Sequence, residues 1–196
     1  MNVPRETEDK LREYGDLVRK WNPRINLVAA GSLSDFDERH IRDSLQLAEL
    51  ADARGGHWVD LGSGGGLPGL VTAIAYGDRP VKVTLVESDK RKAAFLRTVA
   101  RQLDLQKVDV VNARIEQLAP LRADYISARA LAPLPKLITM VKRHLSPEGV
   151  AWLMKGRNWK EEHLEATKDC RFDMTAFPSK TEPEAAILKI TGVSDA

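Results

Sequence analysis

The residues best suited to chemistry form a glycine-rich turn between an apolar run and a helical pattern. Residues 58–69 read Trp-Val-Asp-Leu-Gly-Ser-Gly-Gly-Gly-Leu-Pro-Gly. Gly62, Gly64 and Gly66 lack a Cβ, so the backbone there can turn tightly and lie against a flat ligand at the N-terminus of the next helix. This spacing predicts a site for a nucleotide-like molecule.

An acidic residue ends the next predicted strand. Glu87 follows the apolar run 81–86, and a carboxylate at this place in a parallel sheet can accept hydrogen bonds from both hydroxyls of a ribose. The glycine loop and Glu87 together predict a ligand that contains adenosine. The alternative is that the glycines only build a loop and that Glu87 caps the helix beginning at Lys90.

Two adenosine cofactors fit this pattern. The series Gly64-x-Gly66-x-x-Gly69 satisfies the dinucleotide fingerprint and would suit NAD. Asp60, just before the loop, favours S-adenosylmethionine, because a carboxylate attracts sulfonium and ammonium groups and repels a pyrophosphate. The chain is also short for the separate catalytic domain that hydride-transfer enzymes usually carry. Methyl transfer is therefore favoured over hydride transfer.

Three further side chains are candidates for positioning a substrate. Arg129 ends a predicted strand at the carboxyl edge of the sheet, where it can reach the cofactor or a phosphate. His40 lies one helical turn from Asp43 and can lean over the glycine loop. Lys155 follows the fifth predicted strand, at an edge where cations can meet RNA phosphates. A plain surface or packing role is the alternative for each of them.

A parallel sheet wrapped by helices is needed to position these residues. From Gly56 onward, short apolar runs alternate with helical patterns, which is typical of an α/β domain. We expect seven strands, the last two forming an antiparallel hairpin, over residues 58–61, 81–87, 108–112, 125–127, 150–154, 172–176 and 185–190. We expect helices over residues 69–76, 90–103, 134–145 and 160–167, and a short turn near 114–118.

A helical extension, residues 1–55, precedes this Rossmann-like domain of residues 56–196. Apolar residues at helical spacing predict a first helix over residues 7–21, which Asn22-Pro23 then ends. Ser34 is a good N-cap for a second helix that ends before Gly55. We expect both helices to pack near the cofactor edge of the sheet.

Composition excludes several classes of protein. The 196 residues include one cysteine, Cys170, so an intramolecular disulfide is impossible and a reducing compartment fits. No apolar stretch has the length of a membrane span, and the N-terminus lacks the apolar segment of a secretory signal. His57, His144 and His163 lack metal-ligand spacing, so we expect no metal. We expect a cytoplasmic monomer without a membrane partner.

Motifs along nearly the whole chain resemble the bacterial small-subunit ribosomal RNA guanine N7-methyltransferases, also called the glucose-inhibited division protein B family. The matching segments are Trp21-Asn22-Pro23-Arg24-Ile25-Asn26-Leu27, Arg39-His40-Ile41-Arg42-Asp43-Ser44, residues 60–69, Lys92-x-x-Phe95-Leu96, Ala113-Arg114-Ile115-Glu116 and Ile126-Ser127-Ala128-Arg129-Ala130. The resemblance implies a class I methyltransferase fold with S-adenosylmethionine as donor. It also implies a guanine N7 in the decoding region of 16S ribosomal RNA as acceptor, so the expected partner is that RNA or the small ribosomal subunit.

The resemblance also implies roles for individual residues. The family's cofactor contacts fall on Gly62, Leu67, Ile115, Glu116 and Arg129, with Glu87 at the ribose. Ile115 and Glu116 are expected to flank the adenine. The sequence departs from the family pattern at Leu67, where many members have phenylalanine, and after about Trp159, where it matches only loosely.

The residue types also narrow the range of atoms that the protein could methylate. The sequence lacks the Asn-Pro-Pro-aromatic or Asp-Pro-Pro-aromatic loop of enzymes that methylate exocyclic amines, and Cys170 has no Pro-Cys context for attack on a pyrimidine. Guanine N7 has a free lone pair and no proton, so its methylation needs alignment but no general base. With a net charge of only +2, any affinity for nucleic acid must come from a local patch.

Two other classes of function stay open. An NAD-dependent reductase is the first, although none of the three tyrosines has a lysine four residues later. A non-catalytic RNA-binding protein that keeps an adenosine pocket is the second. Such a protein would be expected to have lost a loop glycine or Glu87, and the sequence retains all of them.

Overall fold

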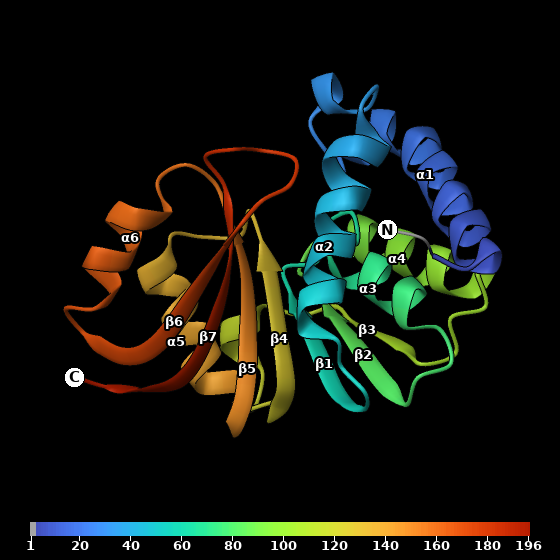
Figure 1. Ribbon diagram of the computed structural model, residues 1–196. Coiled ribbons are helices and arrows are strands. Elements are labelled where there is room, and N and C mark those ends of the chain that lie inside the picture. Colours follow the sequence, from blue (N-terminus) through green and yellow to red (C-terminus); the bar gives the residue numbers. More distant parts are fainter. Residues whose placement is uncertain (1–2) are drawn as a thin grey trace.

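The computed structural model describes residues 3–196, which form a seven-stranded sheet with helices on both faces (Figure 1). The sheet order is β3-β2-β1-β4-β5-β7-β6, and its strands are β1 (Gly56–Leu61), β2 (Val81–Val86), β3 (Val108–Val111), β4 (Ala123–Arg129), β5 (Leu145–Lys155), β6 (Cys170–Pro178) and β7 (Ala186–Asp195). Strand β7 is antiparallel to β5 and β6, and the other pairs are parallel. The predicted α/β class, the seven strands and the antiparallel hairpin are confirmed.

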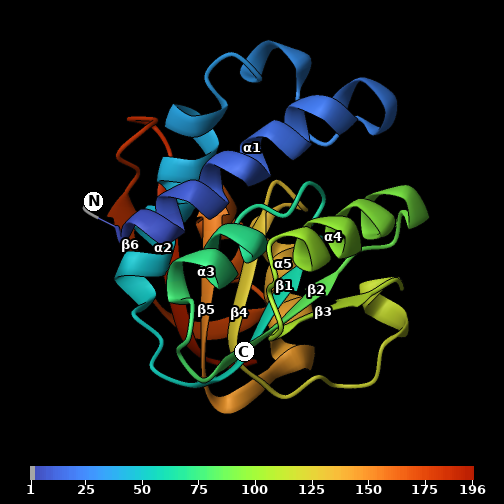
Figure 2. The same ribbon diagram turned by 90° about the vertical axis from the view of Figure 1, so that its right-hand side faces the viewer.

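The helices of the described residues are distributed over both faces of the sheet. They are α1 (Arg5–Ile25), α2 (Arg42–Ala51), α3 (Gly69–Tyr76), α4 (Lys90–Gln102), α5 (Leu134–His144) and α6 (Trp159–Ala166), with short helical turns η1 (Ala30–Ser32), η2 (Asp37–Ile41) and η3 (Ile115–Gln117). Figure 2 shows α1 crossing on the outside of α3 and α4, both of which it contacts. None of these helices is long and apolar enough to cross a bilayer.

Two apolar clusters hold these layers together, one on each face of the sheet. Trp58 belongs to the cluster under α1 to α4, whereas its neighbour Val59 belongs to the cluster under α5 and α6. Both side chains are fully buried. Side chains alternate between the two faces of a strand, and helices cover both faces here, which explains why the strands read as nearly continuous apolar runs.

Two predictions about the helical extension are wrong. Helix α1 continues through Pro23 to Ile25, because the Asn22 side chain accepts hydrogen bonds from the amides of Leu27 and Val28 and stabilises the end of the helix beyond the proline. Ser34 caps no helix. The second helical segment begins with the π-helical turn η2 at Asp37 and continues as α2.

Several strand bounds also differ from the prediction. Strand β5 begins at Leu145 rather than Val150, and β7 runs to Asp195. Both extra segments lie beside a neighbouring strand, with Leu145 opposite Ala123 and Asp195 opposite Cys170. Cross-strand pairing therefore extends them past the end of the apolar pattern. The first two residues of the predicted extension lie outside the described part of the chain.

The direction of strand addition reverses between β1 and β4. From β1 the sheet grows through β2 and β3 on one side, and through β4 and β5 on the other. The connections after β1 and β4 therefore diverge, with α3 on one face and α5 on the other. Ligands of open parallel sheets bind at the carboxyl ends of the strands at such a switch point.

Candidate active site

A cavity of about 700 Å³ lies at this switch point. This volume is within the usual range for small-molecule sites. The glycine loop, the end of β2, the segment around η3 and the segment after β4 form its walls, and the N-terminal extension contributes five more residues, which are Leu27, Val28, Ala29, Ser32 and His40. Five parts of the chain that are distant in sequence thus meet around one space.

The glycine loop borders the cavity in a conformation that side chains rarely adopt. Gly62 and Gly64 have positive φ angles of 66° and 54°. A Cβ on Gly62 would lie 2.5 Å from Leu131 Cδ1, whereas a Cβ on Gly64 would meet nothing closer than 3.8 Å. Space that a Cβ would fill is therefore left open beside Gly64. The Tyr14 hydroxyl donates a 2.7 Å hydrogen bond to the Gly65 carbonyl and fixes the loop to α1.

Glu87 joins this loop to the end of β2. Its Oε2 accepts a hydrogen bond from the Gly64 amide and its Oε1 accepts one from the Asp89 amide, both at 2.8 Å. A carboxylate oxygen can accept a second hydrogen bond, so both oxygens can still receive ribose hydroxyls. Asp89, not Glu87, caps α4, because its side chain accepts from the amides of Arg91 and Lys92. The alternative role of Glu87 as a helix cap is therefore wrong.

Asp60 lies beneath the loop rather than in the cavity wall. Its carboxylate is 1% exposed and accepts a 2.6 Å hydrogen bond from the Ser127 hydroxyl. Burial raises the pKa of Asp60 to about 6, against the lowering effect of that hydroxyl. The side chain can attract a cationic ligand only through its charge, since it does not line the cavity.

This pKa leads to a prediction about cofactor affinity. Between about pH 7 and pH 5, we expect binding of S-adenosylmethionine to weaken as the pH falls, by up to about tenfold per pH unit below 6, because protonation removes the charge that attracts the ligand. Titration calorimetry across this range tests it. In Asp60→Asn the dissociation constant should be raised and independent of pH. A wild-type constant that does not change over this range would contradict the prediction.

Arg129, His40 and Ser32 form a hydrogen-bonded chain across the top of the cavity. An arginine side chain can only donate, so its Nη2 donates to His40 Nδ1 at 2.6 Å. The ring proton of His40 is therefore on Nε2 and is donated to the Ser32 hydroxyl at 2.9 Å, which in turn donates to the Ala29 carbonyl. Burial, and then the charge of Arg129, lower the pKa of His40 to about 4. His40 is thus neutral near pH 7.

The remaining predicted residues are divided between the cavity and its surroundings. Leu67, Ile115 and Glu116 line the cavity. Gly66 does not, and a Cβ there would lie 2.4 Å from Leu70 Cδ1, so its role is to allow the loop to turn. Lys155 is also outside this cavity: its ammonium forms a 2.7 Å ion pair with Glu162 and donates to the Ala132 carbonyl.

Sequence reasoning missed several residues of the site. Ser32, Val28 and Met140 line the cavity, and Tyr14 supports the loop. Ser32 lies in a stretch without helical or strand periodicity, so no local pattern marked it. The prediction that the extension packs near the cofactor edge rested instead on His40 and on the matching segments 21–27 and 39–44.

The cavity has the features that S-adenosylmethionine requires. The open space at Gly64 can take a flat adenosine, the Glu87 carboxylate can hold a ribose, and Ile115 provides an apolar surface for an adenine. Residues 3–196 contain no group of three or more His, Cys, Asp or Glu side chains that could hold a metal ion. Fold and site together define a class I methyltransferase that uses S-adenosylmethionine.

Comparison with known proteins agrees with this class and gives the family. The solved structure of a SAM-dependent methyltransferase from Aquifex aeolicus has the same fold, with a TM-score of 0.62 at 13% identity, over 80% of this chain and 92% of that chain. The family model for rRNA small subunit methyltransferase G (GidB) matches residues 7–187. The chain belongs to this family.

Individual relatives cover the whole chain. The ribosomal RNA small subunit methyltransferase G of Paracoccus denitrificans is 55% identical over 196 residues, which is 100% of both chains. The protein of the same name from Ruegeria pomeroyi is 50% identical over 99% of this chain and 95% of its own. The similarity therefore includes the segment after Trp159, which matched the family pattern only loosely.

Proposed function

We propose that this methyltransferase transfers the methyl group of S-adenosylmethionine to N7 of a guanine in the 16S ribosomal RNA of the small subunit. The observation that carries the proposal is the hydrogen-bonded chain above the cofactor cavity. Both ring nitrogens of His40 are occupied, by Arg129 and Ser32, so the one histidine at the site is not placed to remove a proton. Such a site suits an acceptor atom that has a lone pair and no hydrogen.

The reaction at N7 requires alignment rather than proton transfer. The lone pair of N7 forms the new N–C bond, the electron pair of the broken C–S bond stays on sulfur, and the positive charge moves to the purine. S-adenosylmethionine supplies an activated methyl group when it is bound. The glycine loop and Glu87 orient the ligand, and the chain from Arg129 to Ser32 fixes the side of the cavity where the acceptor approaches.

The absence of a required base predicts a flat pH profile. At saturating cofactor and RNA, we expect kcat to vary less than about twofold between about pH 6 and pH 9, because His40, with a pKa of about 4, is already neutral and N7 is unprotonated. Single-turnover methylation rates across this range test the prediction. A bell-shaped profile centred near pH 7 would contradict it, since it would report an ionising acid or base.

Cations at the rim of the cavity support an RNA acceptor. Lys92, Arg114 and Lys136 line the cavity, and Arg114 and Lys136 are exposed at its rim. The net charge of +2 is small, so attraction for an RNA backbone must come from such local cations. Glu116 lies 3.8 Å from Lys136 and offsets part of its charge, which leaves Arg114 and Lys92 as the main contributors. The protein would act in the cytoplasm, where small subunits are assembled, on either the free RNA or the assembled particle.

The experiment is transfer of labelled methyl from S-adenosylmethionine to small subunits purified from cells that lack the modification. We expect incorporation that saturates at one methyl per subunit and no incorporation into large subunits. Subunits from cells with an intact modification serve as the matched control and should accept almost none. Equal labelling of large and small subunits would contradict the proposed acceptor.

A further inference from the structure

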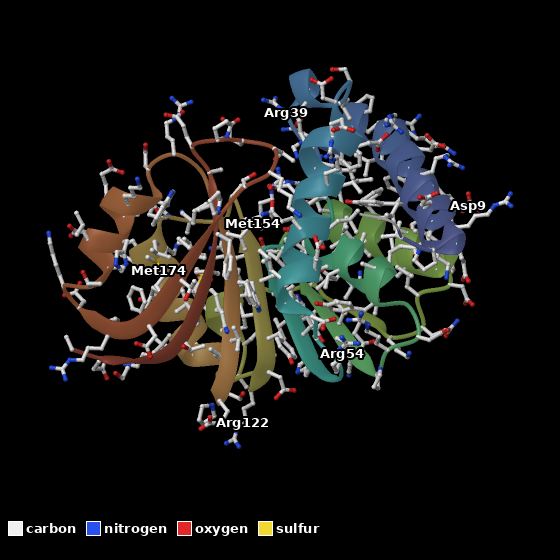
Figure 3. All side chains as sticks on the ribbon, in the orientation of Figure 1. Asp9, Arg39, Arg54, Arg122, Met154 and Met174 are labelled. Atoms are coloured by element: carbon white, nitrogen blue, oxygen red, sulfur yellow. The ribbon has the colours of Figure 1, made fainter. Side chains whose placement is uncertain are left out.

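A second cavity, of about 280 Å³, adjoins the cofactor cavity. His40, Arg129 and Ala130 line both cavities, and we call the boundary at which the two spaces meet beside these residues the partition. The second cavity extends from this partition to the end of β5 and to the loop between β6 and β7, where Thr181 lies. In Figure 3, Arg39 and Met154, which also line it, lie toward the carboxyl end of the sheet, and Arg54 and Arg122 lie toward the other end.

The outer wall of this cavity is held firmly to α2. The Gln46 side chain donates to the Pro178 carbonyl and accepts from the Lys180 amide, at 2.7 and 2.8 Å. The Ser179 hydroxyl donates to Asp43 Oδ1 at 2.8 Å. The loop that closes the cavity is therefore fixed before any ligand arrives, and pre-organised sites of this kind lose little entropy on binding.

Asp43 and Arg129 are two of the charged residues that line this cavity, and each has hydrogen-bonding capacity to spare. Asp43 is 9% exposed, and Ser179 occupies only one of its carboxylate oxygens. Arg129 Nη1 is buried and has no hydrogen-bond partner among residues 3–196. Burial lowers the pKa of Arg129, and the charge of the nearby Asp43 carboxylate opposes this shift. Within the described part of the chain, the cavity thus has an unpaired donor, Arg129 Nη1, next to the cofactor cavity, and an unpaired acceptor, the second carboxylate oxygen of Asp43, farther from it.

We propose that this cavity holds the acceptor guanine and that the Asp43 carboxylate binds its N1–H and 2-amino edge. This assignment rests on the proposed function. Around the edge of a guanine the groups follow in the order N7, O6, N1 and the 2-amino group. With N7 at the partition, O6 meets the free donor of Arg129, and the two hydrogen-bearing nitrogens meet the carboxylate of Asp43.

This arrangement disfavours adenine and stabilises the positive charge of the methylated guanine. Adenine has an amino group in place of O6 and an unprotonated N1. Its amino group would face the Arg129 donor and its N1 lone pair would face the Asp43 carboxylate, so neither contact could be a hydrogen bond. Methylation makes the purine cationic, and a buried carboxylate at its edge stabilises that charge as it develops. His40 is neutral, so Arg129 carries the positive charge of the partition, and the Asp43 carboxylate offsets it. A base seated here must leave its stack, as bases do in other enzymes that modify them.

The test is a substitution at Asp43 combined with a change of the acceptor base. Asp43→Asn keeps an oxygen for the Ser179 hydroxyl but loses the charge and the second acceptor. We expect kcat/KM for guanosine-containing small subunits to fall about thirtyfold, the middle of the range for one bidentate base contact, with an unchanged dissociation constant for S-adenosylmethionine. Glu49→Gln, on the exposed side of the same helix, is the control and should match the wild type.

Inosine at the acceptor position, in subunits reconstituted from ligated RNA, separates base recognition from a structural role. Because inosine lacks the 2-amino group, we expect the wild type to methylate it about tenfold more slowly than guanosine, and Asp43→Asn to methylate both at similar rates. The same guanosine-to-inosine ratio in both proteins would overturn the role of Asp43. If the wild-type protein methylated guanosine and inosine at equal rates, that result alone would overturn the role of Asp43. Failure of the wild type to methylate guanosine subunits would instead overturn the proposed function, and with it this assignment.

Discussion

Gly62→Asp is expected to raise the dissociation constant for S-adenosylmethionine at least about a hundredfold while the protein stays folded. Gly62 has a φ of 66°, and a Cβ there would lie 2.5 Å from Leu131 Cδ1, so the Leu131 side chain in the loop after β4 must move. The new carboxyl group would also lie at the cavity wall, where it takes ligand volume. Isothermal titration calorimetry measures the loss, and a hundredfold change corresponds to about 2.7 kcal/mol.

Gly77→Asp is the matched control for this variant. Gly77 ends α3 with a similar positive φ of 52°, but it is exposed and a Cβ there would meet nothing within 4 Å. Both variants should lose about 1–3 kcal/mol of stability, because a positive φ is unfavourable for a residue with a Cβ, and only Gly62→Asp should lose the cofactor. Wild-type affinity in a folded Gly62→Asp protein would show that the loop does not contact the ligand.

Glu87→Ala is expected to have the second largest effect, a rise of about a hundredfold in the same dissociation constant. The substitution removes the acceptor of the Gly64 and Asp89 amides, so the loop loses its link to β2. It also removes the acceptor for the ribose hydroxyls, and each hydrogen bond to a charged group contributes about 1.5–3 kcal/mol. Calorimetry with S-adenosylmethionine, and with the free nucleoside adenosine, measures the effect.

Asp89→Ala separates cofactor binding from stability of the same segment. Asp89 is the N-cap of α4, so its loss should lower the free energy of unfolding by about 1 kcal/mol. Because Asp89 does not line the cavity, cofactor affinity should change less than about threefold. If Glu87→Ala bound the cofactor as tightly as Asp89→Ala does, the role of Glu87 at the ribose would be wrong.

Features that depend on neighbouring residues could be predicted from the sequence. The glycine loop, the strand before it and the acidic end of β2 are local patterns, and the structure brings Gly64 and Glu87 into direct contact. The seven strands followed from apolar runs, because a sheet covered on both faces needs apolar side chains on both. Ile115 and Glu116 could be placed only through the family resemblance, since nothing in their own spacing indicates a cofactor.

Features that depend on distant contacts could not be predicted. His40 and Arg129 are 89 residues apart in sequence, and their hydrogen bond exists only after η2 comes to lie beside the end of β4. The proline rule failed at Pro23, because the Asn22 side chain stabilises the helix end. Lys155 has the position predicted for it, but Glu162 of α6 pairs with its charge.

Identification of the methylated atom tests whether guanine N7 is the acceptor. Small subunits lacking the modification are incubated with the protein and S-adenosylmethionine, and their 16S RNA is digested to nucleosides and analysed by mass spectrometry. We expect 7-methylguanosine as the only new methylated nucleoside, and we expect none with the Gly62→Asp protein. A methyl group on an exocyclic amine, a ribose hydroxyl or a pyrimidine carbon would contradict it.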